Sequence, residues 1–200
     1  MPILSMNDPA LARFPWLANA VDFVTEMGIA TTDSVKKMHD SMARKTFTAS
    51  GVDSIKILYD LKAATAESVK LGESEAQGAK RLREVADLHA GQAEAIVRTT
   101  TKRAYVDQWA KTIEKPAVKK AFGYVKFVAT RDGRTRPSHR ALDGFICSVD
   151  DPAYQTLLDL LNEWNCRCLL IQLTEKQALK QGIKTYSELP SIATLSLQGA

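Results

Sequence analysis

The character of the sequence changes after Pro116, and no other feature limits the fold as strongly. Before that residue, apolar side chains recur every three or four positions, which is the spacing of one face of an α-helix. Residues 122–130 instead read FGYVKFVAT, a run rich in aromatic and β-branched residues that predicts a strand. We therefore expect an α+β fold, in which a helical region at residues 1–95 precedes a small α+β domain at residues 96–200 with a short β-sheet.

Glycines and N-cap residues divide the first region into separate helices. Gly28, Gly51 and Gly72 each follow a run with helical apolar spacing, and Ser74 is placed to cap the start of another helix. The predicted helices cover residues 15–27, about 32–50, 53–71, 74 to at least 85, and 92–114. This half of the chain is expected to be helical throughout.

The second half is expected to alternate strands and helices. Residues 144–149 and 167–173 predict two further short strands, with a helix at 152–161 between them. Thr174 and Gln177 have the spacing of a capping box, so a last helix should begin there and end near Gly182. The tail at residues 186–200 is expected to be loosely held.

The composition is that of a folded protein with a modest excess of positive charge. Hydrophobic residues make up 45% of the chain and charged residues 25%, unlike a disordered chain. The net charge of +4 and the pI near 8.9 favour an acidic partner such as DNA without requiring one. No apolar run approaches the roughly 20 residues of a membrane span, and the first residues lack the order of a secretion signal. We therefore expect no membrane contact and a place in the cytoplasm where the protein is made.

The cysteines are free thiols or metal ligands. Cys147, Cys166 and Cys168 make an odd number in a chain without an export signal, which disfavours disulfides. Together with His139 they include the nitrogen and sulfur donors that tetrahedral zinc prefers. Two cysteines separated by one residue must bend to hold one ion, and Cys147 lies in an apolar run where a buried, inert thiol is the ordinary interpretation. A structural zinc and buried thiols therefore both remain open.

The densest cluster of charge is the segment RDGRTRPSHRALDG at residues 131–144. A turn begins it, and Pro137 and Ser138 should open a short helix within it. One interpretation is a solvated basic loop, and another is a loop that contacts DNA phosphates. The side chains that would make such contacts are Arg131, Arg134, Arg136 and Arg140.

A structural role for this segment is the more economical interpretation. Asp132 and Asp143 would pair with the arginines and lock the loop, while Gly133 and Gly144 adopt special backbone angles. At the entry to the last predicted strand, Asn165-Cys166-Arg167-Cys168 would place both thiols on one face. The arginine between them would face the other way and tie the strand to the loop.

The same residues include the types that a catalytic site needs. A cysteine with His139 and Asp143 could supply a nucleophile, a base and an orienting carboxylate. However, a reactive thiolate needs an exposed and electropositive position, and the predicted strand is flanked by leucine and isoleucine. Histidine with arginines would suit phosphodiester cleavage, but no second acid or base is evident. We therefore expect that the protein is not an enzyme.

Two motifs carry a resemblance to a known family. The order RTR..H..LDG, a spacer with Asp150-Asp151-Pro152, and then NCRC resembles the signature of the phage Mu F-like minor head proteins. Upstream features occur in the family's order as well: Phe47, Gly51, Gly72, Arg98-Thr99 and Ala104-Tyr105. The resemblance covers roughly residues 45–175. The residues that match the family motifs are Arg98, Asp132, Arg134, Arg136, His139, Asp143, Gly144, Asn165, Cys166, Arg167 and Cys168.

The chain departs from the family pattern at two places. Many relatives have two cysteines before the LDG stretch, where this chain has only His139. Relatives often read HPNCRC, whereas Glu163 and Trp164 stand here in place of the histidine and proline.

The resemblance implies a structural role in phage assembly. The expected protein is a minor capsid or head morphogenesis protein of a tailed phage or prophage, incorporated in the procapsid near the portal. Its implied partners are the portal protein and a capsid or scaffold protein, and its implied locations are the virion head and the host cytoplasm during assembly. The alternative is a nucleic-acid-binding module, with or without zinc, that contacts packaged double-stranded DNA.

Overall fold

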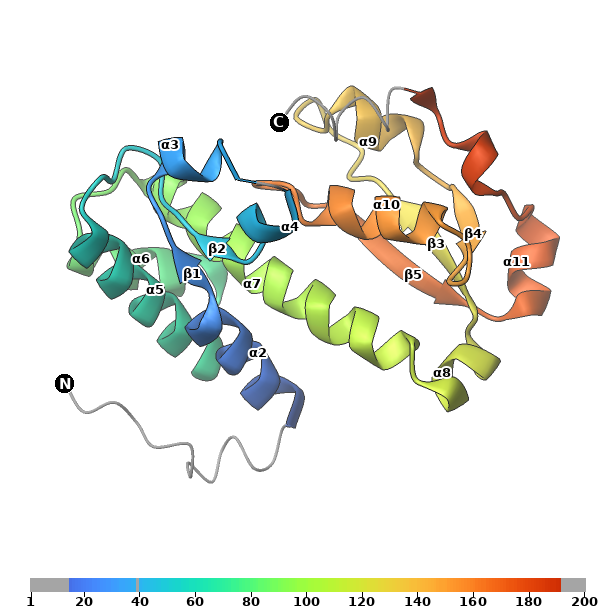
Figure 1. The fold of residues 1–200 in the computed structure, drawn as a ribbon, viewed down its shortest axis with the longest axis horizontal. Helices are drawn as coiled ribbons and strands as arrows, with labels where there is room; N and C mark the ends of the chain where they lie inside the picture. Colours follow the sequence, from blue (N-terminus) through green and yellow to red (C-terminus); the bar gives the residue numbers. More distant parts are fainter. Residues whose placement is uncertain (1–14, 39, 192–200) are drawn as a thin grey trace. The chain divides into compact units, whose positions relative to one another are not determined.

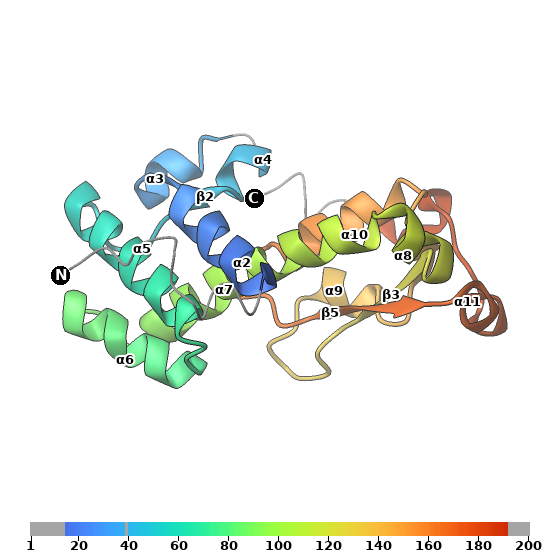
Figure 2. The same ribbon diagram turned by 90° about the horizontal axis from the view of Figure 1, so that it is seen from below.

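The computed structural model describes residues 15–38 and 40–191 (Figures 1 and 2). The chain divides into two compact units, Met1–Gln108 and Trp109–Ala200. This division and the boundary predicted after residue 95 both fall within one helix, α7 (Ala90–Ile113). The sequence features at residues 1–14 and most of the tail, 192–200, lie outside the described residues.

The first unit is built mainly from helices, whose labels follow Figure 1. Apolar side chains of α2 and α5 are buried against each other, and α6 also packs against α5. Ala20 and Val24 of α2 share a buried cluster with Val69 of α5 and Ala104 of α7. The helices of this unit are α2 (Pro15–Glu26), α3 (Thr32–Val35), α4 (Asp40–Ala43), α5 (Ile55–Lys70), α6 (Glu75–Val85) and α7.

Local capping explains where two of these helices begin. The Ser54 hydroxyl accepts a hydrogen bond from the backbone of Ile57 at the start of α5. Ser74 and Gln77 form a capping box at the start of α6, which satisfies two backbone N–H groups that the helix itself leaves unpaired. The glycine between the two helices, Gly72, has a φ of 63°, a left-handed conformation that suits a helix end.

The prediction of one helix over residues 32–50 is wrong. The segment contains α3, α4 and then a two-residue strand, β2 (Thr46–Phe47), which pairs in parallel with β1 (Gly28–Ile29). The pairing gives backbone groups of β1 and β2 hydrogen-bond partners, and the Phe47 side chain is 1% exposed. Burial of a large aromatic residue in a tertiary setting therefore outweighs the helical spacing of Val35, Met38 and Met42.

The second unit is the predicted small α+β unit. Its sheet contains β3 (Tyr124–Val128), β4 (Ile146–Ser148) and β5 (Leu169–Leu173) in the order β4-β3-β5, and both pairings are antiparallel. The three strands match the predicted ones, but each is shorter at one or both ends. The helices are α8 (Pro116–Ala121), α9 (Pro137–Ala141), α10 (Ala153–Leu161) and α11 (Glu175–Gln181), followed by the 3₁₀ helix η1 (Tyr186–Glu188).

The central strand, β3, anchors the core of this unit. Its side chains alternate between half-buried and buried, with Val125 and Phe127 fully buried. In both views α10 lies along one face of the sheet, and α11 contacts all three strands (Figures 1 and 2). The fold class is therefore the expected one, a helical region followed by a small α+β unit with a short sheet.

The helices in the described part of the chain fall short of what a bilayer requires. None of them combines the length and the apolar character needed to span a membrane.

Candidate functional site

His139 lies on the short helix α9, which the sequence starts with a proline. Pro137 occupies the first turn, where its fixed φ suits the helix and its missing N–H costs nothing. This helix points His139 into the core, where the side chain is 1% exposed and meets the Phe127 ring edge-on at 6.0 Å between centroids. A histidine at this position is therefore shielded from solvent.

Cys166 and Cys168 lie in the loop between α10 and β5. The prediction that both belong to a strand is wrong, because β5 begins only at Leu169. The carbonyl oxygen of Arg167 accepts a hydrogen bond from the Thr130 hydroxyl at 3.0 Å. A side-chain hydroxyl therefore makes the hydrogen bond that the backbone of a neighbouring strand would make if β5 began earlier. Asn165 precedes the pair with a φ of 58°, a left-handed turn that asparagine tolerates better than most residues.

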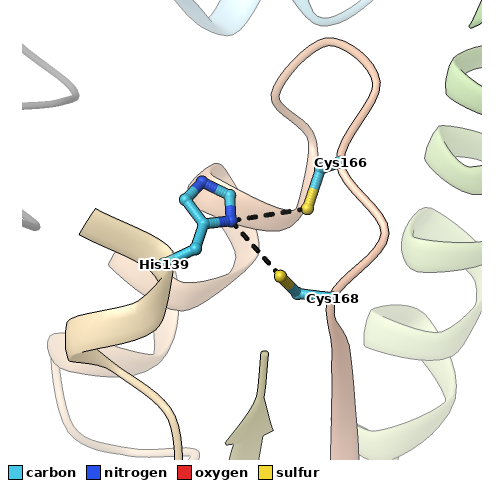
Figure 3. Close-up of side chains that lie close together, drawn as sticks. All are labelled: His139, Cys166 and Cys168. Carbon is cyan, nitrogen blue, oxygen red and sulfur yellow. Dashed lines mark hydrogen bonds between the residues drawn. The ribbon is translucent and has the colours of Figure 1, made fainter. Parts of the chain in front are cut away.

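The loop brings both thiols to one nitrogen of His139 (Figure 3). The Nδ1 atom lies 3.6 Å from Sγ of Cys166 and 3.5 Å from Sγ of Cys168. The three donor atoms all lie within 4.8 Å of one another. Each cysteine is 3% exposed. Within the described residues, this cluster is the group of histidine, cysteine and acidic side chains with the spacing of a metal site.

Glu163 occupies the other side of the imidazole. Its Oε2 atom lies 3.0 Å from Nε2 of His139 and 3.5 Å from Nη1 of Arg136. Burial acts to lower the pKa of His139, but hydrogen bonds to Cys166 and Glu163 outweigh it and raise the pKa to about 9. The carboxylate thus orients the ring and favours a proton on Nε2.

Cys147, the remaining predicted ligand, lies elsewhere. It is in the middle of β4, fully buried, and its thiol is not a member of the cluster around His139. Burial raises the pKa of the Cys147 thiol to about 12, so this side chain behaves as an apolar core residue. Of the four candidate ligands, the structure brings three together.

Asp132 organises the turn before α9. Both of its oxygens face the guanidinium of Arg167, with Nη2 at 2.9 Å from Oδ1. Oδ1 also accepts hydrogen bonds from the backbone of Arg134 at 3.0 Å and from the Thr135 hydroxyl at 3.2 Å. The hydrogen bond from Arg167 is the main reason why the pKa of Asp132 lies well below its usual range. This pairing ties the turn to the loop that carries the two cysteines.

Asp143 joins the end of α9 to the segment just after β3 in the same manner. One oxygen accepts a hydrogen bond from the backbone N–H of Ala129 at 3.0 Å, and the other accepts one from Nε of Arg131 at 2.9 Å. These two contacts, the backbone one first, lower the pKa of Asp143. Gly144 follows with a φ of 83°, and its N–H donates to the carbonyl oxygen of Phe127 at 2.9 Å. A residue with a side chain would be strained at that backbone angle.

The four candidate DNA-contacting arginines are all exposed, and three of them are also engaged within the chain. Arg131 pairs with Asp143, Arg136 donates to the carbonyl oxygen of Trp164 at 2.8 Å, and Arg140 donates to that of Thr135 at 3.1 Å. Arg134 is also exposed, and its backbone N–H is the group that Asp132 holds.

Two residues have contacts that the sequence did not predict. In the sequence Glu163 is only a departure from a family pattern, yet it contacts His139 directly. Its place three residues before Cys166 and two residues after the predicted helix at 152–161 is the signal that could have indicated it. Arg98 matches a family motif but lies in the first unit, where its Nε donates to Glu75 at 2.8 Å.

These observations define a class of protein: a helical unit followed by an α+β unit whose two motif segments interlock around a buried histidine and two cysteines. The sequence profile of the family described as "Phage Mu protein F like protein" matches residues 59–171, more than half of the chain. The chain belongs to this family.

Two curated relatives agree with that assignment. The Mu-like prophage FluMu F protein of Haemophilus influenzae is 44% identical over 64 residues, which cover 32% of this chain and 15% of that protein. A protein of Escherichia phage Mu named "Putative capsid assembly protein F" is 36% identical over 63 residues, covering 32% of this chain and 14% of that protein. The matched region is thus a small part of either relative. No solved structure matches the chain significantly.

Proposed function

We propose that the chain acts in head morphogenesis of a tailed phage or prophage, as a minor capsid protein incorporated in the procapsid near the portal. Membership of the Phage Mu F-like family supports this proposal, as does the name of the phage Mu relative, a putative capsid assembly protein. The role is structural, and the location is the virion head, reached through the host cytoplasm during assembly.

The observation that carries the structural role is the way in which the motif residues are used. Asp132 binds Arg167, Asp143 binds the backbone of Ala129 just after β3, and His139 contacts Glu163. Each motif side chain therefore holds another segment of the same unit in place. Such a network gives an assembly protein a rigid shape, which lowers the ordering cost when it docks on a partner.

Burial of the chemically reactive groups supports a function other than catalysis. His139 is 1% exposed and Cys166 and Cys168 are 3% exposed. A nucleophile and its base must reach a substrate, and a reactive thiolate lies in a partly exposed position. The histidine and the two thiols are thus enclosed in the core of the second unit, and the carboxylate of Asp143 is engaged with Ala129 and Arg131.

The proposed partners are the portal protein and a capsid or scaffold protein. Duplex DNA is the alternative partner, since the chain carries a net charge of +4 and the arginines of the 131–144 loop are exposed. However, Arg131, Arg136 and Arg140 would have to exchange partners within the chain for phosphates. The protein–protein role is therefore the one that we favour.

The test is co-sedimentation of the purified chain with portal assemblies from the same phage genome, and separately with duplex DNA, at low and high salt. We expect portal binding that persists at high salt. Binding to DNA alone, with a steep loss on addition of salt, would replace our proposal with the nucleic-acid-binding function.

Arg134→Glu is the matched control for this experiment. The side chain is exposed, and reversal of its charge would weaken phosphate contacts without breaking the Asp132 pairing, which uses the backbone N–H. Portal binding should be unchanged in this variant. Equal loss of portal binding and DNA binding would mean that the two assays detect the same electrostatic surface.

A further inference from the structure

The two sulfurs lie at the distances from Nδ1 of His139 that a tetrahedral metal ion imposes. A zinc ion lies about 2.3 Å from sulfur and about 2.0–2.1 Å from nitrogen, so ideal tetrahedral angles place the two donors about 3.6 Å apart. The measured distances from Nδ1 to the sulfurs of Cys166 and Cys168 are 3.6 and 3.5 Å. From this geometry we propose that His139, Cys166 and Cys168 bind one zinc ion.

Hydrogen bonding within the cluster is a poorer explanation of the same distances. One ring nitrogen has either a single hydrogen or a single lone pair, and it cannot make two well-directed bonds to two sulfurs. Both thiols nevertheless converge on Nδ1 (Figure 3). A cation placed among the three atoms accepts a lone pair from each of them, which accounts for the convergence.

The hydrogen bond on the far side of the ring gives the second nitrogen of His139 the partner that a ligating histidine requires. Ligating histidines donate their other ring N–H to a carboxylate or carbonyl group, which fixes the tautomer and turns the free lone pair to the metal. Glu163 is placed to accept from Nε2 at 3.0 Å, and Arg136 in turn holds Glu163. Glu163 is thus a positioning residue for the zinc site.

Charge balance favours a bound cation in this buried position. Two thiolates buried without a counterion would be expensive to desolvate. A zinc ion with two thiolates and a neutral imidazole has no net charge, and Glu163 with Arg136 balance each other beside it. The soft sulfur donors select zinc over the hard cations magnesium and calcium, which take oxygen ligands.

The ion would cross-link two segments that the sheet alone leaves separate. His139 lies on α9, and the cysteines lie on the loop that enters β5, 27 and 29 residues later. Asn165 turns this loop in a left-handed conformation, which gives the two cysteines the bend that one ion requires. The described residues supply three ligands of a tetrahedral site, in which zinc takes a fourth. The function of the metal is to stabilise the second unit.

The experiment measures metal directly on the 200-residue chain, purified without a histidine tag. Elemental analysis should give about one zinc per chain. Replacement by Co²⁺ should produce the near-ultraviolet thiolate-to-cobalt absorption and the visible bands of tetrahedral cobalt. Removal of zinc by a chelator should lower the Tm, and added zinc should restore it, since a ligand of the folded state stabilises that state.

Cys166→Ser and Cys168→Ser should reduce bound zinc from about one per chain to near zero. Cys147→Ser is the matched control, because it introduces the same hydroxyl into an equally buried position outside the cluster. That variant should keep its zinc. Glu163→Gln should weaken zinc binding roughly 10- to 100-fold without abolishing it.

Absence of both zinc and the cobalt spectrum in the wild-type chain would overturn the proposal, even if every cysteine variant failed to fold. Equal loss of metal in Cys147→Ser and Cys166→Ser would overturn the assigned ligands. The measurement uses no portal, capsid or DNA, so its outcome is independent of the proposed role in head assembly.

Discussion

Asp143 shows how a single carboxylate fixes the start of the motif loop. One of its oxygens satisfies the backbone N–H of Ala129, a residue that is 4% exposed, and the other pairs with exposed Arg131. The two interactions differ in how much they stabilise the folded protein. A buried backbone donor left without a partner costs about 1–3 kcal/mol, whereas an exposed ion pair contributes about 0–1 kcal/mol. The backbone contact therefore dominates the contribution of this residue to stability.

We predict that Asp143→Ala lowers the free energy of unfolding by about 1–3 kcal/mol, because it leaves the Ala129 N–H unsatisfied. Asp143→Asn keeps an oxygen acceptor and should cost less. Urea unfolding followed by circular dichroism measures both. An equal cost for the two variants would show that the charge of Asp143, and not its acceptor geometry, stabilises the loop.

The pH dependence of Asp143 has a definite sign. Its pKa is lowered in the folded protein, so the carboxylate stabilises the fold above its unfolded pKa of about 3.9. This contribution is lost as the pH falls below that value towards the folded pKa. The stability difference between wild type and Asp143→Asn should therefore shrink as the pH falls below about 3.9.

At the scale of elements, α11 depends on a local signal at the N-cap residue that precedes it. The Thr174 hydroxyl accepts from the backbone of Gln177, and the Gln177 side chain accepts from the backbone of Thr174. The spacing of Thr174 and Gln177 predicts this capping box, and the structure confirms it. Because α11 contacts all three strands and buries Ala178 against Ile146 and Leu173, its stability also supports the sheet.

We predict that Thr174→Ala lowers the free energy of unfolding by about 1 kcal/mol, within a range of about 0.5–2 kcal/mol, because the cap is lost. Thr174→Ser, which keeps the hydroxyl, is the control and should stay close to wild type. Chemical unfolding of the three proteins in parallel measures the difference. A serine variant as unstable as the alanine variant would assign the effect to the threonine methyl group.

The elements also show which structural features the sequence could predict. The strands near residues 124, 146 and 169 and the capping box follow from neighbouring residues, and all of them were predicted. The helical spacing of residues 32–50 does not show that β2 interrupts this segment. Strands β1 and β2 pair across 18 positions, and pairing between distant residues cannot be read from the apolar spacing of neighbouring ones.

The residues of the candidate site were also predictable only in part. Residue types pointed to His139 and the cysteine pair, but Glu163 could be found only from its place in space. Cys147 has the same chemistry as the other thiols, and only its position within β4 separates it from them. The alternation expected for a strand does hold in the loop before β5, since Arg167 turns to Asp132 while both neighbours turn to His139.

At the scale of the whole molecule, the main feature is that α7 belongs to both compact units. The helix runs from Ala90 to Ile113, and the division between the units falls after Gln108. The peptide bonds at the division are therefore hydrogen-bonded within a helix rather than exposed in a linker.

We predict that trypsin leaves α7 intact in the native protein, although the helix contains Arg98, Lys102, Arg103 and Lys111. A protease needs a locally unfolded segment, and a helix shared by two cores opens only with them. Mass spectrometry of a time course identifies the cut sites, and the same digest in urea is the control. Early appearance of two stable fragments separated between residues 95 and 109 would contradict the prediction.

The shared helix also affects how the gene can recombine with other genes. Modules that are exchanged between genes are usually joined by exposed segments, where a new partner can be attached without disturbing either core. A crossover at the border of these units would instead join half of α7 to a foreign sequence and disturb both cores. The family match extends from residue 59 to residue 171 and so includes both sides of this border. The later helices of the first unit and the α+β unit are thus expected to pass between genomes as one inherited block.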